Sequence, residues 1–170
     1  IEKLDENKFQ KFKEKLKKKK IVLSEEQKKS LAQMNIANLK FRVHVLQGTT
    51  GSGKTMIYFE ALKKIISKDL QCLIMLPEIG LTSQFEKKFI EFFGFRPAIW
   101  HSRVSKKNKE IIWSGIAHGK IKVVIGARSS LFLPFKKLGL IIVDEQHKFG
   151  VKQRIELSKK GGKDCDILLM

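Results

Sequence analysis

The sequence GTTGSGKT at residues 48–55 matches the pattern G-x-x-x-x-G-K-[S/T] in full. It follows an alternating apolar run, FRVHVLQ at 41–47, and it precedes residues 54–68, whose apolar side chains share one helical face. Glycines let successive backbone N–H groups turn toward one point, and a helix N-terminus adds the positive end of its dipole. The sequence therefore predicts a strand, a phosphate-binding loop and a helix, in this order.

The polar residues of this loop are expected to bind ATP and Mg²⁺. Lys54 is expected to bridge the β- and γ-phosphates as a point charge, and Thr55 to place its hydroxyl on Mg²⁺. The residues predicted to bind the nucleotide within the loop are Thr50, Gly51, Ser52, Gly53, Lys54 and Thr55.

A pair of carboxylates ends a second apolar run, in the stretch LGLIIVDEQH at 138–147. Asp144 is expected to hold Mg²⁺, and Glu145 to accept a proton from the attacking water. His147 is expected to link the γ-phosphate to the molecule on which the protein acts. The predicted catalytic residues are therefore Lys54, Asp144, Glu145 and His147. The adjacent pair supplies its own base, which favours ATP hydrolysis over phosphotransfer to a small acceptor.

The rest of the chain alternates short apolar runs with helical patterns, which predicts an α/β fold with a parallel sheet and helices on both faces. The predicted strands are 41–47, 71–76, 97–100, 121–126, 138–143 and 165–170, and the predicted helices 54–68, 82–93 and 105–117. Four aromatic residues at helical spacing are expected in the core rather than in a stacking surface: Phe85, Phe89, Phe92 and Phe93.

The composition favours a protein that binds a polyanion and argues against membrane-spanning and disulfide-rich classes. There are 35 Lys and Arg against 17 Asp and Glu, a net charge of +18, which favours a polyanionic partner. Because most of these cations are lysines, the charge can also reflect genome composition. No apolar run reaches the roughly 20 residues that cross a bilayer, and no signal peptide precedes the fold. Two cysteines are too few for a disulfide framework or a zinc site, so a reducing, cytoplasmic setting is expected.

The domain organisation is expected to be simple. Residues 1–20 are Lys-rich and form a helical or flexible segment, and residues 21–170 form one domain. The missing initiator Met and the last apolar run, which stops at Met170, are expected to mark a C-terminally truncated piece of a longer protein.

Five stretches together resemble the first RecA-like domain of superfamily 2 DNA helicases of the DEAH type. They are TGSGKT at 50–55, LPEIGLTSQF at 76–85, HS at 101–102, GARSSLF at 126–132 and LGLIIVDEQH at 138–147. Up to residue 147 the amino-acid sequence is similar to that of the replication-restart branch of the superfamily. The stretch KFGVKQR at 148–154 is similar to the branch that acts in fork repair and transcription-coupled repair.

The resemblance implies further binding residues. In LSEEQ at 23–27, Gln27 would read the adenine edge of the nucleotide. The same residues also fit the start of a helix that Ser24 caps, and the two interpretations are compatible. Contacts to DNA phosphates would come from Thr82, Arg128, Ser129 and Ser130, and more weakly from His101. Ordinary loop chemistry at strand ends is the alternative for these residues.

The implied function is that of an ATP-dependent DNA helicase acting on branched or forked DNA in replication restart or fork repair. The alternatives are a double-stranded DNA translocase of the fork-repair type and a non-catalytic, basic nucleic-acid-binding module. The second RecA-like domain, with its arginine finger, lies outside the 170 residues, so the isolated chain is expected to hydrolyse ATP weakly.

Overall fold

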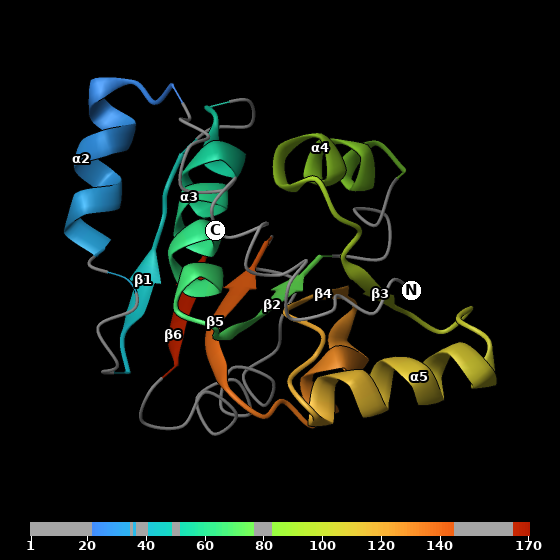
Figure 1. The fold of residues 1–170 in the computed structure, drawn as a ribbon. Coiled ribbons are helices and arrows are strands. Elements are labelled where there is room, and N and C mark those ends of the chain that lie inside the picture. Colours follow the sequence, from blue (N-terminus) through green and yellow to red (C-terminus); the bar gives the residue numbers. More distant parts are fainter. Residues whose placement is uncertain (1–21, 35, 37–40, 49–51, 77–82, 145–164) are drawn as a thin grey trace.

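The computed structural model describes residues 22–34, 36, 41–48, 52–76, 83–144 and 165–170. Within them, six strands form one sheet in the order β1-β6-β5-β2-β4-β3, and every neighbouring pair is parallel (Figure 1). The strands are β1 (Val43–Val45), β2 (Gln71–Met75), β3 (Ala98–Trp100), β4 (Val123–Gly126), β5 (Leu138–Val143) and β6 (Asp166–Leu169). The predicted parallel sheet is therefore confirmed, with β1 shorter than its predicted span.

Helices connect these parallel strands. They are α2 (Glu25–Met34), α3 (Lys54–Ser67), α4 (Ser83–Phe93) and α5 (Lys106–Ala117), with a short 3₁₀-helix η2 (Arg128–Phe132). The predictions for α3, α4 and α5 agree with these bounds, because each helix carries an apolar stripe that the sheet buries. Ser105 caps α5 by accepting a hydrogen bond from the Asn108 backbone N–H. The 3₁₀-helix was not predicted.

The two faces of the sheet carry separate apolar clusters. Along β2, Cys72 and Ile74 belong to the cluster that contains α3 and α4, whereas Leu73 and Met75 belong to the cluster that contains α5. This alternation places helices on both faces, as the sequence predicts. Phe59 of α3 contacts all four predicted core phenylalanines, Phe85, Phe89, Phe92 and Phe93, with ring centroids 5.1–6.2 Å apart. Phe89 and Phe93 are buried in the core as predicted, and Phe85 and Phe92 are partly buried and pack against it.

Both cysteines are free thiols buried in the sheet. Burial raises the pKa of Cys72 well above its usual value, and burial together with the nearby Asp166 raises the pKa of Cys165 to about 12. Both thiols therefore stay neutral at neutral pH. Within the described residues, no helix combines the length and the apolarity that crossing a bilayer requires.

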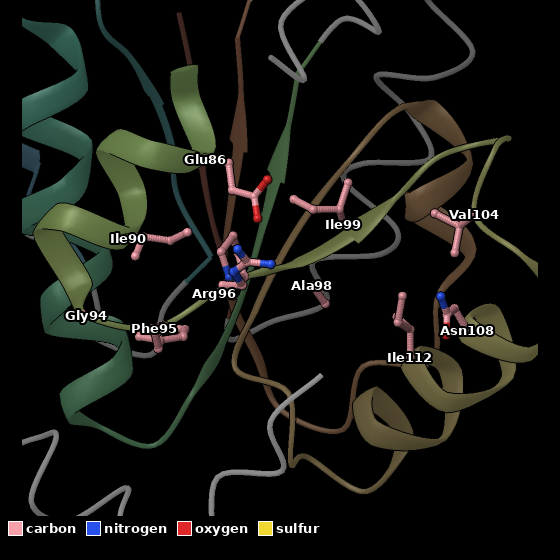
Figure 2. A pocket seen from close by; sticks show the side chains of 11 residues that line it. Glu86, Ile90, Gly94, Phe95, Arg96, Ala98, Ile99, Val104, Asn108 and Ile112 are labelled. Atoms are coloured by element: carbon pink, nitrogen blue, oxygen red, sulfur yellow. The ribbon is translucent and has the colours of Figure 1, made fainter. Parts of the chain in front are cut away.

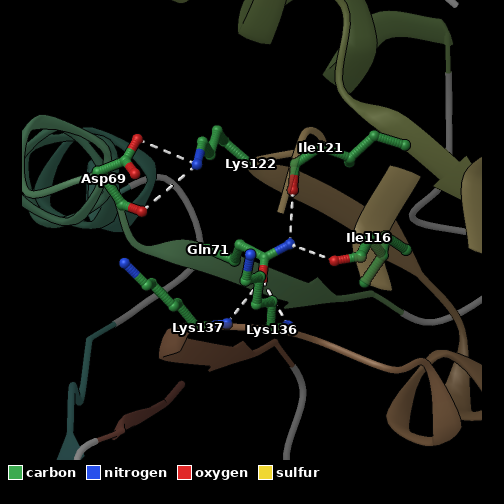
Figure 3. A network of polar contacts seen from close by, with 7 residues as sticks. All are labelled: Asp69, Gln71, Ile116, Ile121, Lys122, Lys136 and Lys137. Atoms are coloured by element: carbon green, nitrogen blue, oxygen red, sulfur yellow. Dashed lines mark hydrogen bonds and ion pairs between the residues drawn. The ribbon is translucent and has the colours of Figure 1, made fainter. Parts of the chain in front are cut away.

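A fully buried amide ties the amino ends of the strands together (Figure 3). The Nε2 group of Gln71 donates to the backbone oxygens of Ile116 (3.0 Å) and Ile121 (2.8 Å). Its Oε1 atom accepts from the backbone N–H groups of Lys136 and Lys137, both at 2.8 Å. One side chain thereby satisfies four backbone groups in α5, the loop before β4 and the loop before β5.

The carboxyl ends of all six strands lie at one edge of the sheet, because the strands are parallel. The phosphate loop follows β1, Asp144 follows β5, and Arg128 follows β4. Ligands of open parallel sheets bind outside this edge. The fold therefore brings the predicted site residues to one side of the molecule.

Candidate nucleotide-binding site

The last turn of the phosphate loop is shaped by Gly53, the residue before α3. Gly53 has φ +79° and ψ 19°, a left-handed conformation that glycine adopts without strain. A Cβ atom at this position would lie 2.4 Å from Nε2 of Gln27. Glycine has no side chain with which to cap the helix, and a helix N-terminus presents backbone N–H groups that suit an anion.

Replacing Gly53 with alanine should weaken nucleotide binding about tenfold. The added Cβ strains the backbone by about 1–2 kcal/mol and pushes the Gln27 amide away from the loop. Gly94 offers a matched control, because its φ is +74° but nothing lies within 4 Å of an added Cβ. Both Gly53→Ala and Gly94→Ala should lower thermal stability, and only the first should change the affinity for an ATP analogue measured by calorimetry. Equal affinities for the two variants would contradict this account of the loop.

Gln27 braces the loop from the neighbouring helix. Its Nε2 group donates to the backbone oxygen of Ser52 at 3.2 Å. Its Oε1 atom accepts from the Ser24 backbone N–H at 3.0 Å, and its own N–H donates to the Ser24 hydroxyl at 3.3 Å. These reciprocal bonds form a capping box at the start of α2. The helix-cap interpretation is therefore confirmed, and the adenine contact of Gln27 stays a prediction.

Lys54 folds over the loop that precedes it. Its ammonium group donates to the backbone oxygen of Gly48 at 2.5 Å. The charge thus lies beside the turn whose N–H groups are expected to surround phosphate oxygens.

The acid at the end of β5 acts on the pKa of Tyr58 in α3, a residue that sequence reasoning missed. The Asp144 backbone N–H donates to Met75 O at 3.0 Å, which holds the strand end in register with β2. Burial raises the pKa of Tyr58 well above its usual value, and the nearby Asp144 carboxylate raises it further. A side-chain hydrogen bond between Tyr58 and Thr55 opposes this rise. Thr55 at the start of α3 and Asp144 after β5 lie at the same edge of the sheet.

Thr55 and Asp144 fit a magnesium ion by the chemistry of their donor atoms. Mg²⁺ prefers oxygen ligands and is commonly held by one or two protein oxygens together with substrate phosphates and water. A threonine hydroxyl at the start of α3 and a strand-end carboxylate supply such oxygens. The predicted metal residues therefore fit the ion that the family implies.

Several predicted residues lie outside the described part of the chain. These are Thr50 and Gly51 of the loop, Glu145 and His147 of the acidic stretch, and Thr82 of the expected DNA path. The Lys-rich segment 1–20 also lies outside it.

The predicted DNA contacts gather in the turns after β3 and β4. The two turns touch, because the Ala127 backbone N–H donates to Trp100 O at 3.2 Å. Arg128 and Ser129 are exposed there. Ser130 is buried instead, and its hydroxyl donates to Ala127 O at 2.5 Å. This bond gives Ser130 a role in shaping the turn, so we retain only its two neighbours as candidate phosphate contacts.

The turn at His101 is held by hydrogen bonds from residues close to it in the sequence. Its Nδ1 atom accepts a hydrogen bond from the Arg103 backbone N–H at 3.1 Å, and Lys109 of α5 donates to Ser102 O at 3.2 Å. Arg103 and Lys109 add positive charge beside the predicted contacts, and sequence reasoning missed both. Their signal in the sequence is weak, because lysine and arginine are abundant throughout the chain.

A hollow of about 650 Å³ lies beside the edge strand β3, between α4 and α5 (Figure 2). Its apolar lining consists of Ile90, Phe95, Ala98, Ile99, Val104 and Ile112. Among the described residues, no predicted nucleotide or nucleic-acid contact lines it. The hollow is therefore separate from the candidate site.

The parallel sheet, the phosphate loop and the acid after β5 define a P-loop domain of the RecA-like class. A model of the DEAD/DEAH box helicase family matches residues 24–168, so the chain belongs to the DEAD/DEAH box helicase family. The chain is 53% identical over 131 residues to the replication restart protein PriA of Rickettsia conorii. This match covers 77% of the chain and 20% of the relative, so the chain spans about a fifth of that protein's length.

Solved structures agree with the family. RecG bound to a three-way DNA junction matches with a TM-score of 0.69 and 28% identity, over 98% of this chain and 22% of RecG. UvsW from bacteriophage T4 matches with a TM-score of 0.65 and 21% identity, over 99% of this chain and 34% of UvsW, which shows a shared fold. A replication restart protein and a RecG structure with bound DNA are therefore both among the matches.

Proposed function

We propose that this chain is the ATP-binding motor domain of a cytoplasmic, ATP-dependent DNA helicase that acts in replication restart or fork repair. The observation that carries the proposal is the parallel sheet, which brings the phosphate loop after β1 and Asp144 after β5 to the same edge. It supports a single site built from the phosphate loop and the strand-end acid. The identity with a Rickettsia PriA supports a role in replication restart.

In the proposed reaction, water attacks the γ-phosphate in line. Lys54 stabilises charge on the phosphate oxygens, and Thr55 and Asp144 hold the cation. Mg²⁺, when bound, neutralises part of the charge that develops on the phosphate groups. Glu145 orients the water and accepts its proton. His147 links the nucleotide to the DNA-binding surface.

The remaining loop residues position the nucleotide. The backbone N–H groups of Thr50, Gly51, Ser52 and Gly53 surround the phosphates. Gln27 reads the adenine edge with the N–H and the oxygen lone pair that its bonds to Ser52 O and Ser24 N–H do not use.

The proposed DNA surface consists of the exposed Arg128 and Ser129, together with Thr82 and His101. Contacts to phosphate oxygens fix the position of a strand without reading its bases. This surface therefore suits a motor that moves along DNA of any sequence. Forked or branched DNA is its proposed track.

The similarity to RecG favours a second candidate, a translocase that moves on double-stranded DNA. Both candidates use the same nucleotide site. Strand-displacement and triplex-displacement assays on the full-length protein separate them, because a pure translocase removes the third strand without opening the duplex.

The Arg128→Ala variant tests the DNA part of the proposal. Loss of one phosphate contact should weaken binding to duplex and forked DNA by several-fold, and should reduce the slope of log affinity against log salt by about one. Fluorescence anisotropy of labelled DNA across a salt series measures both quantities.

Arg96→Ala is the matched control, because Arg96 is also an exposed arginine but lies before β3, at the opposite end of this strand from His101. This variant carries the same change in net charge. It should leave the salt slope unchanged. If the two variants weaken binding equally, the affinity comes from net charge alone, and the proposed surface is wrong.

A further inference from the structure

Two tryptophan rings meet where the edge strand β3 lies against α5. Trp100 is the last residue of β3, and Trp113 lies in the second half of α5. Their ring centroids are 6.4 Å apart, with an interplanar angle of 45°. Trp100 is partly buried and packs against the core cluster on this face of the sheet, whereas 46% of Trp113 is exposed. Trp100 therefore supports a large aromatic ring that stays open to solvent.

The packing of α5 does not depend on Trp113. The helix is anchored in the core by Ile112 and Ile116, which are almost fully buried. Apolar surface that stays in water contributes no hydrophobic free energy to folding, so an indole exposed to this extent stabilises the fold far less than a buried one. The exposed ring of Trp113 is therefore available for a partner.

The surroundings of the two rings are positively charged. Lys109 lies one helical turn before Trp113 on the same side of α5. Its ammonium group is 6.0 Å from the centroid of the Trp100 ring and donates to Ser102 O in the turn after β3. Residues 101–113 contain four Lys and Arg and a single acidic residue, Glu110. A partner that covers these rings should therefore be an anion.

The two rings are continuous with the proposed phosphate contacts. Trp100 O accepts a hydrogen bond from the Ala127 backbone N–H, and the exposed Arg128 follows Ala127 directly. A DNA backbone held at these turns carries bases that an aromatic ring beside it can stack on. Such stacking tolerates any base, because every base has a π-face. In a duplex these faces already stack on their neighbours, so the partner that fits is a single strand.

We infer that Trp113, supported by Trp100 and flanked by Lys109, is a stacking site for a base of single-stranded DNA. This inference rests on the proposed function, because it requires DNA held at the turns after β3 and β4. It adds a contact to the bases beside the proposed contacts to phosphate, and it names the form of DNA that this side of the domain takes.

The Trp113→Ala variant removes the ring and leaves the charges in place. The probes are a labelled single strand of thymidines and a strand of equal length whose bases are replaced by abasic sites. The unaltered chain should bind the thymidine strand about five- to tenfold more tightly than the abasic strand. Trp113→Ala should lose most of this preference, with its affinity for the abasic strand unchanged. Fluorescence anisotropy measures both affinities.

The preference within each protein is the informative quantity, because a general loss of stability lowers both affinities together. The slope of log affinity against log salt should stay the same in Trp113→Ala, since stacking releases no counterions from phosphate. A Trp113→Ala variant that keeps the full preference for bases would overturn the inference. An equal loss of affinity for both strands would overturn it as well.

Ile111→Ala is the matched control on the same helix. Ile111 is 41% exposed and lies two residues before Trp113, a rotation of about 200° around the helix axis. This variant should keep the full preference for bases. Trp113→Phe retains a smaller aromatic face and should keep part of the preference. If Ile111→Ala loses as much as Trp113→Ala, or if Trp113→Phe loses as much as Trp113→Ala, the site is not an aromatic stacking site and the inference is wrong.

A spectroscopic readout leaves Trp113 in place. The chain has two tryptophans, so Trp113 is the only one in the Trp100→Phe variant. The thymidine strand should quench its fluorescence, and the abasic strand should not; equal quenching by both strands would overturn the inference. If the unaltered chain binds neither strand nor a duplex, the DNA part of the proposed function fails and the inference with it. If it binds DNA but shows no preference for bases, only the stacking site fails.

Discussion

Replacing Lys54 with alanine should lower the affinity of the chain for an ATP analogue about 10- to 100-fold in the presence of Mg²⁺. Hydrogen bonds to charged groups contribute about 1.5–3 kcal/mol each, and Lys54 is the cation that the loop directs at the phosphates. The ammonium group already lies over the loop, on Gly48 O, so it needs only a short movement to reach a phosphate. Isothermal titration calorimetry measures the change directly.

Lys64→Ala is the matched control for this variant. Lys64 is an exposed lysine in the last turn of α3, so its removal changes the net charge equally at the far end of the same helix. Its affinity for the analogue should equal that of the unaltered chain. If Lys54→Ala also binds normally, the chain does not use the loop for nucleotide, and the non-catalytic nucleic-acid-binding module becomes the better account.

Replacing Gln71 with leucine should reduce the free energy of unfolding by about 3–5 kcal/mol. The four backbone groups that Gln71 satisfies lie in three different segments, and leucine removes this partner from all of them, although Ile116 O keeps its bond from the Gly119 backbone N–H. Unpaired buried donors and acceptors carry the full cost of losing water, which exceeds the gain from a more apolar side chain. Chemical denaturation followed by circular dichroism measures this loss.

Gln84→Leu controls for the chemistry of the substitution. Gln84 lies on the exposed face of α4, so the same change there should alter the free energy of unfolding by less than about 0.5 kcal/mol. A similar, small effect at both positions would show that the amino ends of the strands are held by apolar packing alone.

The elements that sequence analysis predicted well are those whose signal is local. The helix at 54–68 carries an apolar stripe and follows a glycine turn, and the structure places α3 at Lys54–Ser67. The strand at 138–143 is a continuous apolar run, which a sheet buried on both faces requires. Gly53 was predicted as part of the loop for the same reason, because its backbone role follows from the motif itself.

The features that sequence analysis missed depend on contacts between distant segments. The partners of Gln71 lie 45 to 66 residues away, and no local pattern marks them. The 3₁₀-helix after β4 begins beside a contact with the preceding strand, where the Ala127 backbone N–H donates to Trp100 O. Tyr58 is different: its spacing of three residues from Thr55 on a predicted helix was a readable signal that the two side chains meet.

If the phosphate loop and the acid after β5 hold one triphosphate, a crystal structure of the chain with Mg²⁺ and a non-hydrolysable ATP analogue will show it. We expect the phosphates against the N–H groups at the start of α3, with the cation between the Thr55 hydroxyl and the Asp144 carboxylate. A triphosphate bound elsewhere, or a cation that touches neither of these two side chains, would contradict it.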